Sequence, residues 1–304
     1  MRRQSVEIPV QEKFDNKKLA WADRDNLPRT YHRVYRGDAR EMRELGDSPC
    51  VHLVVTSPPY WTLKKYPGAA SEGQLGSIRD CGQFQRELAK VWRRCYDVLH
   101  PGGRLCVVVG DVCLSRRAAG RHNVIPLHAD IIAHARAVGF DYLSPIFWYK
   151  IANAATEVKG NGSTFLGKPY EPNAVIKNDV EYILIFRKPS EYRHPTEWQR
   201  RLSVIDKQDH QRWFRQVWLD IPGESTKIHP APFPKELAFR LISMFAFVGD
   251  TVLDPFWGLG NTTAAAIEAH RSSVGYEIEA EYTRIARNQF SKLDFEGYKI
   301  EFFE

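Results

Sequence analysis

Thr56-Ser57-Pro58-Pro59-Tyr60-Trp61 directly follows an apolar run at residues 51–55. The run has the composition of a strand that is buried on both faces, as the strands of a parallel sheet are. Two consecutive prolines end the strand, because each proline fixes φ and lacks an N–H, and a residue before proline is kept out of the α region. The sequence therefore predicts a stiff turn at the carboxyl end of a strand, with carbonyl oxygens and few donors.

Such a turn suits a ligand group with two N–H donors, such as the exocyclic amine of cytosine or adenine. We expect the Ser57 hydroxyl and the Pro58 carbonyl to accept its hydrogen bonds, and Tyr60 to offer a flat face to a base turned out of its helix. The alternative is a proline-terminated strand with a surface tyrosine. The candidate catalytic residues are Ser57, Pro58, Pro59 and Tyr60.

Apolar runs of strand type alternate with helix-like runs along most of the chain. The strands are predicted at residues 31–35, 51–55, 105–109, 142–149, 181–186, 251–253 and 273–276. The helices are predicted at residues 39–45, 84–99, 127–138, 235–247, 261–269 and 280–293. This alternation predicts an α/β fold with a doubly wound, mostly parallel sheet.

The composition is that of an ordinary soluble globular protein with an excess of positive charge. Of 304 residues, 43% are hydrophobic and 26% charged, and the formal net charge is +6, an excess that suits nucleic acid. The five cysteines form no CxxC pair, which is typical of reduced thiols in a cytoplasmic protein. No histidine spacing indicates a metal site. No signal-peptide segment or membrane-crossing stretch occurs, so we expect no membrane association.

A second motif joins a predicted strand to a predicted helix: Asp254-Pro255-Phe256-Trp257-Gly258-Leu259-Gly260-Asn261-Thr262-Thr263. Its two glycines allow positive φ and close approach of a ligand to the backbone, and the helix start after them favours an anion such as a carboxylate. Glu277 follows the next strand, where an acidic residue can hold the two hydroxyls of a ribose. The spacing is neither GxGxxG nor a phosphate loop. A ribose and a carboxylate without phosphates describe S-adenosylmethionine.

Together the two motifs resemble those of the DNA amino-methyltransferases, in which (D/N/S)PPY follows one strand and a DPFxGxGTT loop binds S-adenosylmethionine. The proline turn precedes the glycine motif by most of the chain, which resembles the circularly permuted beta group. Gly37-Asp38 is similar to the acidic strand end near the adenine, Trp148-Tyr149-Lys150 to a WxK element, and residues 229–234 to an HPxxxP segment. The resemblance covers nearly all of residues 35–290.

The resemblance implies a permuted, Rossmann-like methyltransferase core with an inserted DNA-recognition region. Its parts are an N-terminal arm (1–30), a catalytic half (31–150), a target-recognition region (151–228) and a cofactor-binding half (229–304). The implied cofactor-binding residues are Asp38, Asp254, Pro255, Phe256, Gly258, Gly260, Asn261, Thr262, Glu277, Pro232 and Phe233. Trp257 and Asn261 depart from a small residue and a threonine in the family, so we expect an altered pocket wall there.

Ser57 bears on the target base, because in this family serine at that position usually accompanies N4-cytosine methylation and aspartate N6-adenine methylation. The resemblance therefore implies site-specific methylation of a flipped cytosine in double-stranded DNA, with N6-adenine methylation as the alternative. More distant alternatives are a protein-glutamine or RNA methyltransferase and a DNA-binding protein that has lost catalysis. C5-cytosine methylation needs a cysteine nucleophile, but Pro49-Cys50 opens its strand and is interpreted as structural. A homodimer and a cognate restriction endonuclease are further expected partners.

Positive charge is concentrated at residues 187–218, with aromatic residues interleaved: Trp198, Trp213, Phe214 and Trp218. Cations for phosphates and rings for stacking fit nucleic-acid contact. The alternative is a solvated helical face with its tryptophans turned inward. The candidate DNA-binding residues are Lys64, Lys65, Arg116, Arg117, Arg121, Arg200, Arg201, Arg212 and Arg215.

Overall fold

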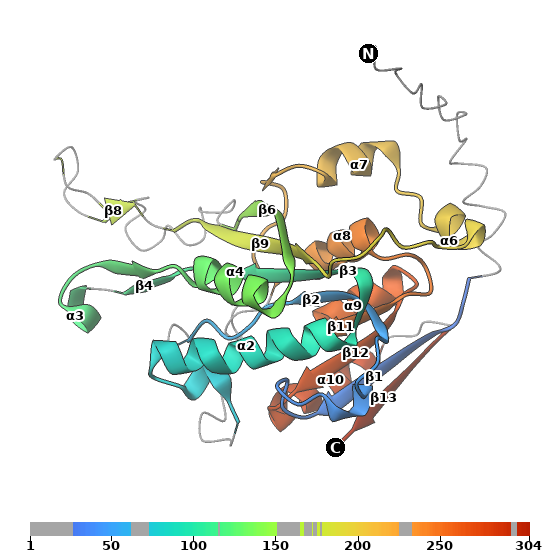
Figure 1. Cartoon of the computed structure of the whole chain (residues 1–304), viewed down its shortest axis with the longest axis horizontal. Coiled ribbons are helices and arrows are strands. Elements are labelled where there is room, and N and C mark those ends of the chain that lie inside the picture. Colours follow the sequence, from blue (N-terminus) through green and yellow to red (C-terminus); the bar gives the residue numbers. More distant parts are fainter. Residues whose placement is uncertain are drawn as a thin grey trace, which may run out of the picture.

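The centre of the molecule is a large twisted sheet. The computed structural model describes residues 27–61, 73–114, 116–150, 165–166, 172, 175–176, 178–224, 233–292 and 297–304. In these residues nine strands pair in the order β10-β6-β9-β3-β2-β11-β12-β1-β13 (Figure 1). Their bounds are β1 Thr30–Arg36, β2 Val51–Thr56, β3 Leu99–Val109, β6 Asp141–Tyr149, β9 Val180–Arg187, β10 Val217–Trp218, β11 Thr251–Asp254, β12 Ser272–Glu277 and β13 Tyr298–Phe303.

Neighbouring strands are parallel except where β9 is one of the pair. β9 runs antiparallel to both β3 and β6, whereas β2 is parallel to β3 and to β11. The predicted α/β class with a mostly parallel sheet is confirmed. Since parallel strands end at the same edge, the loops after β2, β11, β12 and β1 share the carboxyl edge of the sheet.

Helices cover both faces of the sheet, as the alternation of β2 side chains requires. Val54 joins a core cluster with α2 (Cys81–Val98) and α4 (Leu127–Val138), whereas Leu53 and Val55 join the opposite cluster with α8 (Lys235–Phe245) and α9 (Asn261–Glu268). A third cluster lies under α10 (Ala280–Phe290). The doubly wound arrangement that the sequence predicts is therefore present.

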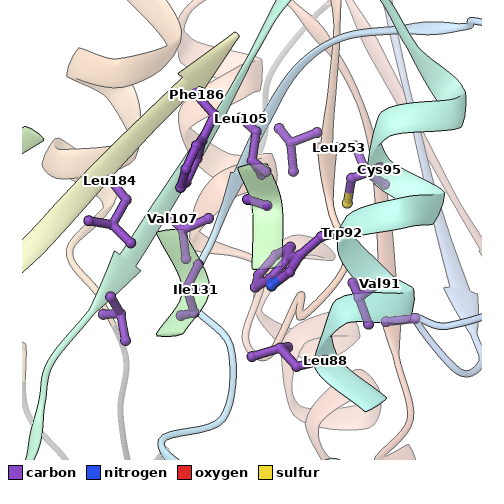
Figure 2. Close-up of a cluster of buried hydrophobic side chains, with 14 of the residues drawn as sticks. Leu88, Val91, Trp92, Cys95, Leu105, Val107, Ile131, Leu184, Phe186 and Leu253 are labelled. Carbon is purple, nitrogen blue, oxygen red and sulfur yellow. The ribbon is translucent and has the colours of Figure 1, made fainter. Parts of the chain in front are cut away.

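The core beneath α2 shows why that helix forms where it does. Asp80 caps its first turn by accepting a hydrogen bond from the backbone N–H of Gln83 at 2.7 Å. Its apolar residues recur at helical spacing, so Leu88, Val91, Trp92 and Cys95 point together onto the sheet (Figure 2). They meet β3, β9 and β11 through Leu105, Val107, Leu184, Phe186 and Leu253, beside Ile131 of α4.

Several local predictions are wrong. Residues 39–45 form no α-helix: Met42 has φ of 43°, and only the 3₁₀ turn η2 (Arg43–Leu45) follows. β13 was not predicted, and neither was the hairpin of β4 (Val112–Leu114) and β5 (Asn123–Ile125), which encloses α3 (Arg116–Ala119). Also unforeseen were η4 (Leu75–Ser77) and the two-residue strands β7 (Phe165–Leu166) and β8 (Val175–Ile176).

The aromatic residues of the basic block are divided between core and surface. Trp213 and Trp218 are only 6% and 1% exposed and pack against α8, so their interpretation as stacking residues is wrong. Trp198 and Phe214 are exposed. The block contains two short helices, α6 (Glu197–Leu202) and α7 (Lys207–Trp213).

All five cysteines are free thiols. Within the parts of the chain that the structure describes, none of the helices has the length and apolar character that a membrane crossing needs. The same residues include no group of His, Cys, Asp and Glu side chains arranged to hold a metal ion.

Candidate active site

The two sequence motifs meet at the carboxyl edge of the sheet, because β2 and β11 are adjacent parallel strands. Thr56 at the end of β2 donates a hydrogen bond from Oγ1 to Oδ1 of Asp254 at the end of β11, at 2.7 Å. Thr262 of α9 donates to the other carboxylate oxygen at 2.6 Å. Burial raises the pKa of Asp254 to about 6, although both hydroxyls lower it. The buried Asp254 carboxylate therefore connects the end of β2, where the proline turn begins, to the start of α9, where the glycine motif ends.

A cleft of about 610 Å³, open to solvent, lies between these loops. Both motifs contribute to its wall, so the proline turn and the glycine motif meet at one cleft although they are far apart in the sequence. The lining residues are Gly37, Asp38, Ala39, Ser57, Pro58, Pro59, Gly73, Gln74, Leu75, Pro255, Phe256, Tyr276, Glu277, Ile278 and Tyr282.

Glu277 is the buried acid of the cleft. Its Oε2 accepts the N–H of Gly258 at 2.7 Å, and its Oε1 accepts the N–H of Glu279 at 2.8 Å. Burial raises the pKa of Glu277 to about 7, and the nearby carboxylates of Glu279 and Asp254 also raise it. The two hydrogen bonds lower the pKa but do not offset these effects. The carboxylate is thus fixed in place, and its protonation changes near neutral pH.

Asp38 faces the cleft from the end of β1 and is held by Arg40. The Arg40 guanidinium donates to Asp38 Oδ2 at 2.5 Å and to Glu87 Oε2 at 2.5 Å. It also reaches the carbonyl of Gly73 at 3.3 Å, and Gln74 Nε2 donates to Glu279 Oε1 at 3.0 Å. Residues 73–75 therefore line the cleft while joined to both of its sides. Arg40 and Gln74 were not predicted as site residues, because only partners that are distant in the sequence reveal their roles.

The glycine loop is shaped by a tryptophan that lies behind it. Trp257 is 2% exposed, donates from Nε1 to Thr263 Oγ1 at 2.8 Å and stacks on Phe290. Trp257 is absent from the cleft lining, so any effect of this residue on the pocket wall has to pass through the loop that it supports. Gly260 has φ of 84°, and a Cβ there would lie 2.6 Å from the Trp257 ring.

The predicted cofactor residues thus fall into two groups. Asp38, Pro255, Phe256 and Glu277 line the cleft. Asp254, Gly258, Gly260, Asn261, Thr262 and Phe233 shape or support the loop; Asn261, for example, donates from Nδ2 to the Phe233 carbonyl at 2.7 Å. Pro232 lies outside the described residues.

The proline turn ends in a buried polar network. Tyr60 is only 4% exposed, so it is no surface tyrosine, and its predicted stacking face is not presented to solvent. Its hydroxyl accepts a hydrogen bond from Ser57 Oγ at 3.2 Å and donates to Glu181 Oε2 at 3.1 Å. Lys150 donates from Nζ to Glu181 Oε1 at 2.7 Å. Glu181 was not predicted as a site residue, although its partner Lys150 belongs to the Trp148-Tyr149-Lys150 element.

Arginines lie on the same side of the sheet as the cleft. Arg116 and Arg117 begin α3, and Arg121 follows it, inside the β4–β5 hairpin that extends beyond the carboxyl end of β3 (Figure 1). All three are exposed, and none forms an ion pair with another residue that the structure describes.

The other predicted DNA contacts lie elsewhere. Arg200 and Arg201 belong to α6, which contacts the segment before β11: Gln199 donates from Nε2 to the Val248 carbonyl at 3.4 Å, and Ser203 Oγ, just after the helix, accepts the Val248 N–H at 2.8 Å. Arg212 pairs with Asp220, and Arg215 donates to the Gln211 carbonyl at 2.8 Å. Lys64 and Lys65 lie outside the described residues.

Cys50 lies at the start of β2, at the opposite edge from the cleft. Its Sγ is 3.8 Å from the Leu45 carbonyl, and burial raises its pKa. This position supports the interpretation of Pro49-Cys50 as structural.

Residues 51–288 match the model of a protein family described as DNA methylase. The chain is 38% identical over 278 residues to the type II methyltransferase M.MjaI of Methanocaldococcus jannaschii. The aligned region covers 82% of this chain and 88% of that protein. A putative DNA modification methylase of Thermus thermophilus, solved in complex with S-adenosyl-L-methionine, superposes with a TM-score of 0.73 at 46% identity, covering 90% of this chain and 98% of that one. The cytosine-N4-specific PvuII DNA methyltransferase has a similar fold, with a TM-score of 0.60 at 19% identity over 89% and 90% of the two chains.

Proposed function

Because this chain belongs to the DNA methylase family, we propose that it methylates the exocyclic N4 amine of a cytosine turned out of double-stranded DNA. At the coarser level it is a site-specific DNA methyltransferase that uses S-adenosylmethionine. The observation that carries the cytosine assignment is Ser57 at the first position of the turn, on the wall of the cleft. N6-adenine methylation by the same architecture is the second candidate.

The order of the motifs supports assignment to the permuted beta group. β2 and β11 are neighbours in the sheet, yet the strand with the proline turn comes first in the chain. β9 and β10 fall within residues 151–228 but belong to the core sheet. We therefore assign the target-recognition role to the other residues of this region. A homodimer, a cognate endonuclease and a cytoplasmic location remain predictions.

The residues of the cleft fit the proposed methyl donor. Asp38 and Glu277 supply acidic acceptors suited to ribose hydroxyls and an amino group, and Phe256 and Ile278 supply apolar walls suited to an adenine. Gly258 and Gly260, with φ of 54° and 84°, keep the loop compact behind this wall. S-adenosylmethionine supplies an electrophilic methyl group on a sulfonium sulfur.

The chain's own contribution is orientation of a weak nucleophile. The lone pair of an exocyclic amine is shared with the ring, so the amine must be turned and polarised before it attacks. Ser57 Oγ and the Pro58 carbonyl accept hydrogen bonds from its two hydrogens, which favours a tetrahedral nitrogen with a free lone pair. Orientation supplies most of the acceleration, and acceptors aimed at the positive charge that develops on nitrogen add to it.

Transfer of labelled methyl groups to DNA, followed by digestion to nucleosides, tests both levels of the proposal. We expect N4-methylcytosine as the labelled product. N6-methyladenine would move the assignment to the second candidate, and absence of any labelled base would refute the proposed activity. Ser57→Ala should lower kcat by about 10²–10³-fold, the usual cost of one lost polar contact to a transition state, with unchanged affinity for S-adenosylmethionine by calorimetry.

A further inference from the structure

A continuous chain of hydrogen bonds connects the proline turn to an ion pair on two neighbouring strands. It runs from Ser57 Oγ to the Tyr60 hydroxyl at 3.2 Å, and from that hydroxyl to Glu181 Oε2 at 3.1 Å. Lys150 Nζ donates to the other oxygen of Glu181 at 2.7 Å. Ser57 lines the cleft, whereas Tyr60 and Glu181 are buried behind it.

The ion pair at one end sets the direction of donation along this chain of hydrogen bonds. A carboxylate paired with an ammonium group accepts hydrogen bonds and cannot donate them. Tyr60 must therefore give its single proton to Glu181, and toward Ser57 its oxygen can only accept. Ser57 in turn gives its single proton to Tyr60, so toward the cleft it presents lone pairs alone.

This direction matters for the reaction at the amine. A Ser57 proton that pointed into the cleft would bond the lone pair of the amine nitrogen, which has to attack the methyl group. A Ser57 lone pair instead binds one of the two amine hydrogens and leaves the nitrogen lone pair free. The hydroxyl at this position is useful only if its orientation is fixed.

The surrounding structure holds Glu181 in place. At the end of β3, Gly110 leaves room for it, since a Cβ there would lie 3.2 Å from Glu181 Cγ. The cation is fixed as well: Lys150 Nζ lies 5.5 Å from the centre of the Trp148 ring. Trp148 itself is anchored by its Nε1 donating to the Ile221 carbonyl at 2.8 Å.

We propose that Glu181, charged and held by Lys150, is a positioning residue that acts through the Tyr60 hydroxyl to make Ser57 an obligatory acceptor for the target amine. The inference rests on the proposed role of Ser57 and holds for either target base. In this arrangement the Tyr60 hydroxyl has a function of its own, in addition to any stacking of the Tyr60 ring on the target base.

The decisive variant is Glu181→Gln, measured alone and combined with Tyr60→Phe. With Lys150 still bound to the amide oxygen, the amide nitrogen faces Tyr60 and donates to it, which reverses the chain and turns the Ser57 proton into the cleft. We expect kcat to fall by about 10²-fold, while the dissociation constants for DNA and S-adenosylmethionine stay within about threefold. In the Tyr60→Phe background the chain of hydrogen bonds between Ser57 and residue 181 is interrupted, so Glu181→Gln should cause no further loss of kcat.

The outcomes separate this inference from the proposed function. Without methyl transfer by the wild-type enzyme, the proposed function fails. If the wild type is active, two results would refute the positioning role of Glu181. One is full kcat in Glu181→Gln, and the other is an equal reduction of kcat by Glu181→Gln with and without the Tyr60 hydroxyl. Glu191→Gln, at an exposed glutamate outside the site, is the matched control and should behave as wild type.

A second variant keeps the inference testable if Glu181→Gln does not fold. Lys150→Met removes the cation that fixes Glu181, so Glu181 no longer holds the Tyr60 hydroxyl in one orientation. We expect kcat to fall in Lys150→Met, and no further fall when the same substitution is made in Tyr60→Phe. An equal loss with and without the Tyr60 hydroxyl would indicate a purely structural ion pair and overturn the proposal.

Discussion

Glu277 shows at the scale of one residue how burial and function are coupled. Its carboxylate is almost fully enclosed, and two backbone N–H groups are not enough to offset the loss of water, so its pKa rises from an ordinary 4.5 to about 7. Because the folded pKa is above the ordinary value, this group contributes less stability to the ligand-free protein as pH rises from about 4.5 to about 7.

Cofactor affinity should have the opposite pH dependence. The ionised Glu277 is the better acceptor for ribose hydroxyls, so affinity for S-adenosylmethionine should fall about tenfold for each pH unit below about 7, if binding needs the ionised form alone. Calorimetric titrations at pH 6, 7 and 8 measure this change. Glu277→Gln should bind more weakly at every pH and lose the dependence. Equal wild-type affinity at pH 6 and 8 would show that this carboxyl does not hold the ligand.

Individual site residues were predictable from sequence where their neighbours along the chain define the role. Glu277 follows a strand and a glycine motif, and Ser57 begins a proline turn, so both could be placed without coordinates. Glu181 could not, because its partners Tyr60 and Lys150 are distant in sequence and meet it only through the pairing of β9 with β3 and β6. Gln74 was missed for the same reason.

At the scale of elements, Trp257 and Gly275 form a complementary pair between the glycine loop and β12. A Cβ at Gly275 would lie 2.1 Å from Cδ1 of Trp257, so the indole lies directly on the backbone of the strand. The sequence shows Trp257 as a departure from the family pattern, but not the bare strand position that accommodates it. The pair sets the distance between β12 and the loop that precedes α9.

Gly275→Ala should therefore destabilise the protein by about 1–3 kcal/mol, the usual cost of overpacking, or somewhat more. In a Trp257→Leu background the same substitution should cost less than about 1 kcal/mol, because the ring that the new methyl group meets is gone. Denaturant unfolding of the four proteins measures both values. The same cost in both backgrounds would assign the strain to another contact.

Long periodic elements were the predictable part of the fold, whereas short ones were not. The apolar spacing of α2 and α4 gave both helices to within a few residues. Residues 39–45 have helix-like composition, but Asp38 is bound to Arg40 and Met42 takes a left-handed conformation, so the run folds as turns. In the basic block, tertiary packing turned Trp213 and Trp218 inward, which charge and aromatic content alone could not reveal.

At the scale of the whole molecule, two groups of candidate DNA-binding arginines lie at opposite edges of the sheet. Arg116 and Arg117 of α3, with Arg121 just after it, extend from the carboxyl edge of the sheet, where the cleft opens, whereas α6 contacts the segment before β11 at the opposite edge (Figure 1). These three residues are called the α3 arginines below. A base that reaches Ser57 has to enter from the carboxyl edge. The flanking DNA must then pass the α3 arginines and cannot reach α6 on the same short path.

Replacing Arg116, Arg117 and Arg121 together with alanine should weaken DNA binding at low salt. The slope of log K against log salt should flatten by about 0.9 for each phosphate contact that is lost. The matched control is the pair Arg200→Ala and Arg201→Ala, which removes charge from the opposite side and should leave both affinity and slope near wild type. Fluorescence anisotropy across a salt series distinguishes the two variants. A larger loss in the α6 variant would mean that DNA wraps around the molecule to its far side.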